Sequence, residues 1–229
     1  MSSIQAEVEN IGGASQLSQM NPASSDSLST MRQCLSTPIP HLKDAVRYLD
    51  AAVSAHLQHK PAIAEEKFRL ADMPENLQRG KSIWGNSAVH IRFRSSEPTL
   101  AKELREKPRM PGSEMKSQIH QRDGRHCRFC GMPVIRMETR KFIHHAYPQA
   151  VPWGRTEVEQ HAAFLAMWAQ YDHIVPHARG GKSDLDNLVL TCGTCNFGRA
   201  QYTLQEVAVT DPRNRLPIQS QWDGLERFR

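Results

Sequence analysis

Two pairs of cysteines have the C-x-x-C spacing that is typical of metal-binding turns. The pairs are Cys127–Cys130 and Cys192–Cys195. Two residues between thiolates let both sulfurs of one turn face the same ion, and two such turns complete a tetrahedral Cys₄ zinc site. A redox pair or two unrelated pairs are the alternatives, but a redox pair requires a βαβ context that the flanking sequence does not indicate. The spacing therefore predicts a structural zinc site.

The two cysteine pairs are unusually far apart. The 61 residues 131–191 lie between them, against about 15–20 in a compact zinc ribbon. If residues 131–170 separated the pairs, each pair would need other ligands, and nearby histidines would be the candidates: His126, His144, His145 and His161. Because four cysteines already complete a tetrahedron, we expect one shared site. The fifth cysteine, Cys34, is expected to be an ordinary thiol.

A second group of residues that could do chemistry lies between Tyr171 and Ala200. An apolar approach ends at Asp172-His173, a glycine pair follows at Gly180-Gly181, and a second apolar run leads to the second cysteine pair and Asn196. This pattern predicts a strand, a loop, a strand and a helix. Asp, His and Asn are residue types that can bind a hard cation and activate a water molecule.

This segment resembles the HNH endonucleases, the ββα-metal nuclease superfamily, in a zinc-stapled version. The resemblance rests on D-H-I-x-P-x-x-x-G-G-x-x-x-x-x-N-L-x-x-x-C-x-x-C-N and extends over about residues 113–210. The signature positions are His173, Asn187 and Asn196, an H-N-N pattern where many members end in His. The resemblance implies an α+β fold: a ββα-metal core with a structural Cys₄ zinc site, preceded by a small helical domain.

The resemblance also implies a reaction, the metal-dependent hydrolysis of DNA to 5′-phosphate and 3′-hydroxyl ends. By similarity, His173 is the general base, which suits an imidazole with a pKa of about 6.5. Asp172 and Asn196 correspond to ligands of one catalytic Mg²⁺ or Mn²⁺ ion, and Asn187 holds the loop between the strands. From the residues alone, Asp172 is also compatible with a turn cap, and Asn196 with a helix cap.

Further basic residues flank the predicted site and are candidate contacts to DNA, which we expect to be double-stranded. They are His177, Arg179, Lys182 and Arg199. An ordinary solvated surface is the alternative for all four, and His177 could instead be a second metal ligand.

The elements that position these residues are expected in five regions. These are a disordered tail at 1–40, a helical accessory or docking domain at 41–91, a linker at 92–112, the nuclease domain at 113–210 and a C-terminal tail at 211–229. Apolar residues at helical spacing predict helices from about 42 to 57 and from 61 to about 73. Further helices are expected at 113–122 and 157–171.

Composition limits the class of protein. The 229 residues carry a net charge of +5, which admits a polyanion as partner without requiring one. No apolar run approaches the roughly 18–20 residues of a membrane-spanning helix. The first residues lack the basic start and apolar stretch of a secretory signal, so we expect a cytoplasmic location.

The arrangement of a helical module before an HNH domain resembles the nuclease component of Septu-like anti-phage systems. That resemblance implies a role in prokaryotic defence, with a partner ATPase that docks on residues 42–72. A stand-alone homing or restriction enzyme is one alternative, although no helix-turn-helix or second zinc finger is evident. The other is a non-catalytic zinc-ribbon module that binds nucleic acid, which would not need Asp172, His173 and Asn196 together.

Overall fold

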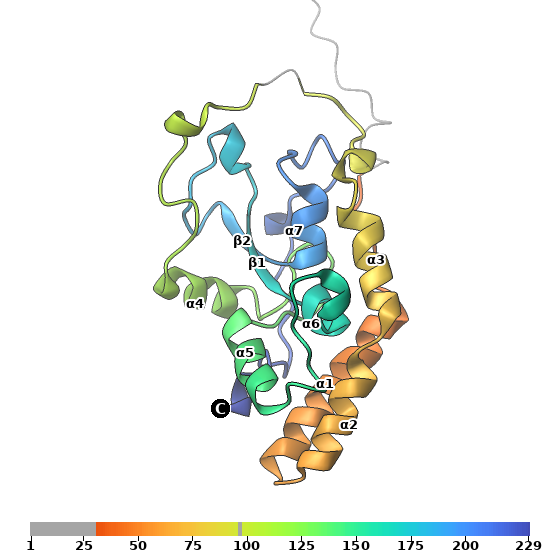
Figure 1. The fold of residues 1–229 in the computed structure, drawn as a ribbon. Helices are drawn as coiled ribbons and strands as arrows, with labels where there is room; N and C mark the ends of the chain where they lie inside the picture. Colours follow the sequence, from red (N-terminus) through yellow and green to blue (C-terminus); the bar gives the residue numbers. More distant parts are fainter. Residues whose placement is uncertain (1–30, 96–97) are drawn as a thin grey trace, which may run out of the picture. The chain divides into compact units, whose positions relative to one another are not determined.

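A two-stranded antiparallel sheet is followed directly by a short helix (Figure 1). The computed structural model describes residues 31–95 and 98–229. Strand β1 (Ala169–His173) pairs with β2 (Leu188–Cys192), with Ala169 opposite Cys192 and His173 opposite Leu188. Helix α7 (Gly193–Arg199) begins where β2 ends. The predicted strand, loop, strand and helix are therefore confirmed, and with them the α+β class and the ββα order.

Burial explains why this small sheet is stable. All five residues of β2 are buried, so its apolar run packs on both faces, as expected for a strand covered on two sides. The chain around the first cysteine pair lies along the free edge of β2, where the Arg128 N–H donates to the Leu190 carbonyl at 2.8 Å. The Leu190 N–H in turn donates to the buried Asp123 carboxylate at 2.8 Å.

Three helices precede this core: α1 (Pro40–Leu57), α2 (Pro61–Ala71) and α3 (Pro74–Trp84). Each has a proline in its first turn, where the missing N–H costs nothing and the fixed φ suits a helix. Helices α1 and α2 form a hairpin that buries Leu49, Val53 and Phe68. The two predicted helices are thus present, and α3 is a third helix within the helical region expected at 41–91.

The helices share a packed core with the rest of the chain, because residues 31–229 form one unit. A Cβ added at Gly198 of α7 would lie 2.5 Å from the Ile83 side chain of α3, so these helices meet at a glycine. Near the C-terminus, Phe228 is buried and stacks on His56 of α1 at 4.2 Å. The boundaries expected at 40, 91, 112 and 210 stay predictions, and the part of the expected tail at 1–30 lies outside the described residues.

The long insertion between the cysteine pairs folds into helices α5 (Met137–Ala146) and α6 (Ala162–Ala166). The prediction of one helix over 157–171 is wrong, because only the central part of this range is α-helical and Ala169 already belongs to β1. Residues 162–167 are all buried, so the apolar stretch has no solvent face, and Tyr171 pairs with Leu190 of β2. Helix α4 (Ser113–Arg122) matches the helix expected at 113–122.

Over the described ranges, no helix combines the length with the apolar character that crossing a membrane demands.

Candidate active site and cysteine cluster

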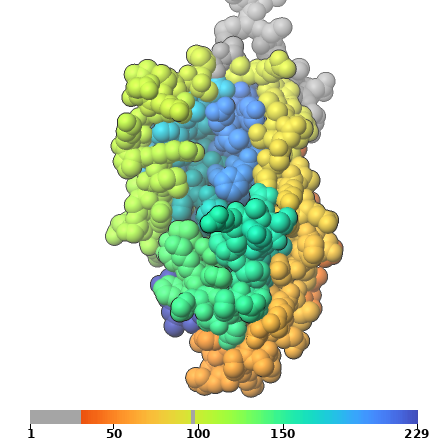
Figure 2. Space-filling view, in the orientation of Figure 1, coloured from red at the N-terminus to blue at the C-terminus, as the bar shows by residue number. Residues whose placement is uncertain are grey.

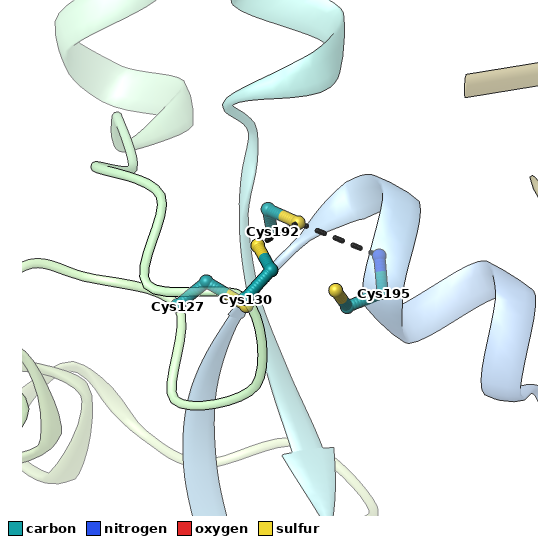
Figure 3. Close-up of side chains that lie close together, drawn as sticks. All are labelled: Cys127, Cys130, Cys192 and Cys195. Atoms are coloured by element: carbon teal, nitrogen blue, oxygen red, sulfur yellow. Dashed lines mark hydrogen bonds between the residues drawn. The ribbon is translucent and has the colours of Figure 1, made fainter. Parts of the chain in front are cut away.

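The four cysteines meet in space (Figure 3). Their sulfur atoms all lie within 4.8 Å of one another, and Cys130 Sγ is 3.8 Å from Cys192 Sγ. Zinc–sulfur bonds of about 2.3 Å place the corners of a tetrahedron about 3.8 Å apart, so the cluster fits a zinc ion. The insertion does not separate the pairs, and a single shared cluster is confirmed.

Backbone hydrogen bonds shape both cysteine turns. In the first turn, the Gly131 N–H donates to the Cys127 carbonyl at 2.8 Å. In the second, Cys192 caps helix α7, and its sulfur accepts the Cys195 N–H at 3.4 Å. The clustered cysteines therefore fix the start of the helix that carries Asn196.

The histidines considered as alternative zinc ligands have other partners. Three of them lie at hydrogen-bond distance from backbone carbonyls. His126 Nδ1 is 2.6 Å from the Gly124 carbonyl oxygen, and His144 Nδ1 is 2.8 Å from that of Val151. His161 Nε2 is 2.9 Å from the Phe68 carbonyl oxygen, and the fourth histidine, His145, is exposed. Among residues 31–95 and 98–229, the four cysteines are the one group of three or more His, Cys, Asp or Glu side chains close enough to hold a metal.

Four of the predicted site residues, but not Asn187, line one pocket of about 570 Å³. Asp172 and His173 come from the end of β1, His177 from the 3-10 turn that follows, and Asn196 from the first turn of α7. Residues that sequence reasoning assigned to a linker, Arg105, Arg109 and Met110, line the same pocket. The ββα segment and residues 98–112 both contribute to its lining, together with Ser87 and residues 200–202.

Asp172 is paired with Arg199 inside the protein. The guanidinium donates from Nε to Oδ2 at 2.8 Å and from Nη2 to Oδ1 at 2.5 Å. Their side chains are 7% and 2% exposed. Burial raises the pKa of the Asp172 carboxyl above its ordinary value, and Arg199 opposes that shift. Arg199, expected as a DNA contact, is thus buried and holds Asp172 in place.

His173 is 5% exposed, and its Nε2 lies 3.0 Å from the hydroxyl of Ser183. Ser183 donates its own hydrogen to the Arg109 carbonyl at 2.9 Å. Burial, with a further contribution from the neighbouring His177, lowers the pKa of His173 to about 4. The imidazole is therefore neutral at pH 7 and can accept a proton.

Asn187 ties together the loop between the strands. Its Oδ1 accepts the Val175 N–H at 2.8 Å, and its Nδ2 donates to the carbonyls of Val175 at 3.1 Å and Lys182 at 2.8 Å. Gly181 is required beside it, because an added Cβ would lie 1.8 Å from the Val175 carbonyl oxygen. This geometry suits a residue that holds the loop rather than one that reacts.

The remaining predicted residues differ in how accessible they are. The Asn196 side chain is half-buried at the pocket and has no hydrogen-bond partner in the described part of the chain. His177 Nε2 lies 2.7 Å from the Glu106 carbonyl, and its ring centre is 5.4 Å from that of His173. Arg179 pairs with Glu206 at 3.0 Å, whereas Lys182 is exposed.

Sequence reasoning missed Ser183 and residues 98–112 as parts of this site. Glu106 accepts the Ser183 N–H through Oε2 at 2.6 Å, and the Leu100 N–H donates to the Ala178 carbonyl at 2.8 Å. The density of charge between 102 and 109 is the one signal in the sequence that could have indicated a role beyond that of a linker.

Comparison with protein families gives one match. Residues 166–199, which include β1, β2 and α7, match the family of HNH endonucleases. No curated protein and no solved structure matches the chain. The matched segment contains Asp172, His173, Asn187 and Asn196 and two of the four clustered cysteines. The chain therefore carries a segment similar to the HNH endonucleases, and this similarity supports a metal-dependent nuclease.

Proposed function

We propose that the protein is an endonuclease that hydrolyses DNA phosphodiester bonds in the pocket beside His173. The observation that carries the proposal is that Asp172, His173 and Asn196 line one pocket within the segment that matches HNH endonucleases. A zinc-ribbon module that only binds nucleic acid would not need these three side chains at one cavity.

In the proposed reaction, His173 takes a proton from a water molecule as that water's oxygen attacks the phosphorus atom. The new P–O bond forms, the P–O3′ bond breaks, and the leaving 3′ oxygen takes a proton from solvent. The imidazole is suited to this because it is neutral at pH 7 and lines the pocket. The products are a 5′-phosphate and a 3′-hydroxyl.

Asp172 and Asn196 are the proposed ligands of a catalytic divalent ion. A carboxylate and an amide carbonyl are the oxygen donors that Mg²⁺ and Mn²⁺ prefer. Arg199 uses one lone pair on each Asp172 oxygen and the His173 backbone N–H uses a third, which leaves one of the four lone pairs for an ion. The donor set thus fits such an ion, which when bound would stabilise the negative charge of the transition state and of the leaving oxygen.

The charge around the pocket suits a polyanion. Arg105 and Arg109 line it, while its one lining carboxylate, Asp172, is paired with Arg199. Lys182, in the loop between the strands, is exposed and is a further candidate contact. We propose double-stranded DNA as the substrate, bound through its phosphates by these cations.

The test is cleavage of supercoiled plasmid by the purified zinc-loaded protein with Mg²⁺ or Mn²⁺. His173→Ala should abolish metal-dependent nicking or linearisation, and His145→Ala, at an exposed histidine of α5, should not. Equal cleavage by His173→Ala would refute the proposed base. A folded, zinc-loaded protein that binds DNA but never cuts it would favour the non-catalytic zinc module.

For the biological setting we propose prokaryotic defence, with a partner ATPase that docks on residues 42–72. Support comes from the resemblance to Septu-like systems and from exposed apolar side chains within this range, at Leu57, Ile63 and Leu70. Co-purification with an ATPase encoded beside this protein, lost when Ile63 and Leu70 become Ser, is the expected result. Retained co-purification would place the docking surface elsewhere.

A further inference from the structure

We propose that Ser183 is a positioning residue for His173, and that residues 98–112 complete the active site by fixing the direction of its hydroxyl. In this arrangement the His173 proton is on Nε2, and Nδ1 is the atom that receives the proton of the attacking water. The proposal rests on the proposed nuclease function for its consequence in catalysis, but the tautomer itself can be measured without DNA.

The assignment follows from counting hydrogens. A serine hydroxyl has one hydrogen, and a carbonyl oxygen can only accept. The Ser183 hydroxyl donates to the Arg109 carbonyl at 2.9 Å. His173 Nε2, 3.0 Å from the same Oγ, must therefore supply the hydrogen of the second bond. Because a neutral imidazole carries one N–H, Nδ1 is left with a free lone pair.

The position of Nδ1 agrees with this role. Nδ1 has no hydrogen-bond partner among the described residues. It is also not completely buried, so part of its surface is accessible to solvent. The ring lines the same pocket as Asp172 and Asn196, the proposed metal ligands. A water molecule in this pocket can thus meet both Nδ1 and the scissile phosphate.

Residues 98–112 hold Ser183 through two separate contacts. Besides the Arg109 carbonyl that accepts its hydroxyl, the Glu106 carboxylate accepts its backbone N–H at 2.6 Å. The Glu106 carbonyl oxygen also lies 2.7 Å from His177 Nε2. Glu106 therefore contacts both ends of the segment 177–183. In Figure 2 this yellow-green segment lies beside the blue atoms of α7.

Without these contacts the hydroxyl could rotate and donate to His173 Nε2. The imidazole proton would then move to Nδ1, and Nδ1 could no longer accept a proton. Residues 98–112 therefore select the reactive tautomer of the histidine from far away in the sequence. The residues that they bind, His177 and Ser183, are 71–77 positions from their partners.

The first test is the ¹⁵N NMR spectrum of full-length, zinc-loaded protein with labelled histidines, in which His173→Gln identifies the His173 signals. We expect protonated Nε2 and unprotonated Nδ1. Ser183→Ala should shift the population toward protonated Nδ1, and Ser183→Thr, which keeps the hydroxyl, should restore the original spectrum. The control is Ser82→Ala, at an exposed serine of α3 whose hydroxyl also donates to a carbonyl, that of Arg79. Protonated Nδ1 in the unmodified protein, or no change in Ser183→Ala, would overturn the proposal.

The second test is plasmid cleavage. Ser183→Ala should lower kcat about 10–100-fold with little change in KM, as expected when the partner that orients a reacting histidine is lost. Ser183→Thr should recover most of this activity. Glu106→Ala should lower kcat in the same direction, whereas Glu103→Ala, an exposed change on the same segment, should not. Unchanged kcat in Ser183→Ala would refute the positioning role.

The two tests separate this proposal from the proposed function. If no condition yields cleavage while the spectra change as expected, the nuclease proposal fails and the tautomer assignment stands. If cleavage requires His173 but the spectra do not respond to Ser183→Ala, the nuclease stands and the role of Ser183 is wrong.

Discussion

Replacing Arg199 with glutamine would leave the Asp172 carboxylate buried without its cation. Arg199 donates two hydrogen bonds to this carboxylate and one to the Tyr202 carbonyl at 2.7 Å, and its side chain is 2% exposed. Removing one partner of such a buried pair costs about 3–5 kcal/mol. For a chain of this size, that loss corresponds to a decrease in Tm of roughly 6–20 °C.

The assay is urea unfolding of zinc-loaded protein at pH 7.5, with Asp172→Asn and the double variant completing a cycle. Because Asn and Gln are both neutral, the double variant should lose less stability than the sum of the single changes, by about 1–3 kcal/mol. Arg47→Gln is the matched control: its ion pair with Asp44 is exposed, so we expect a loss below about 1 kcal/mol. Equal losses for Arg199→Gln and Arg47→Gln, or strict additivity in the cycle, would refute the reasoning.

Two further predictions concern the cysteine cluster and a buried histidine. Cys127→Ser should lower the zinc bound per chain and destabilise the protein, whereas Cys34→Ser should keep the zinc; full zinc retention in Cys127→Ser, measured by metal analysis, would contradict the shared site. His120, which lies 3.1 Å from the Tyr171 hydroxyl, has its pKa lowered to about 3 by burial. Below about pH 6.5 the unfolded chain binds a proton that the folded chain does not, so lowering the pH from 7.5 to 5.5 should cost about 1.4 kcal/mol at this residue. Urea unfolding at both pH values should show that His120→Gln loses this part of the pH dependence; an unchanged dependence would show that another group causes it.

The parts of the site that are close in sequence could be predicted. The spacing from Asp172 to Asn196 indicated the strands, the loop and the helix, and the structure has them in that order. The C-x-x-C spacing indicated the cysteine cluster. Helices α1 and α2 were visible because each has one apolar face. In these cases local spacing determines which side chains meet.

The prediction failed where burial on all sides removed the periodic signal. Residues 162–171 contain apolar residues at helical spacing, but β1 begins at Ala169 because pairing with β2 decides its conformation. Burial also distinguishes Arg199 from the other basic residues that were predicted to contact DNA. In sequence it is one more cation, and only the fold shows that it faces Asp172.

The contacts of residues 98–112 were missed for a different reason. They contain a single 3-10 turn, at Lys102–Leu104, and no other helix or strand. Their contacts to His177 and Ser183 join residues more than 70 positions apart, and two of them use backbone carbonyls, which every residue has. Side-chain types therefore gave no indication of these bonds.

The separation of the cysteine pairs has a consequence for folding kinetics. Cys130 and Cys192 are 62 positions apart, and closing a flexible loop of that length costs about 4 kcal/mol of chain entropy by the relation used for cross-links. An ion that binds one pair in the unfolded chain must wait for the other pair until helices α5 and α6 and the β1–β2 hairpin have drawn the ends together. We therefore expect completion of the tetrahedron to be a late step in folding. Zinc would then stabilise chains that have already folded and would not nucleate folding.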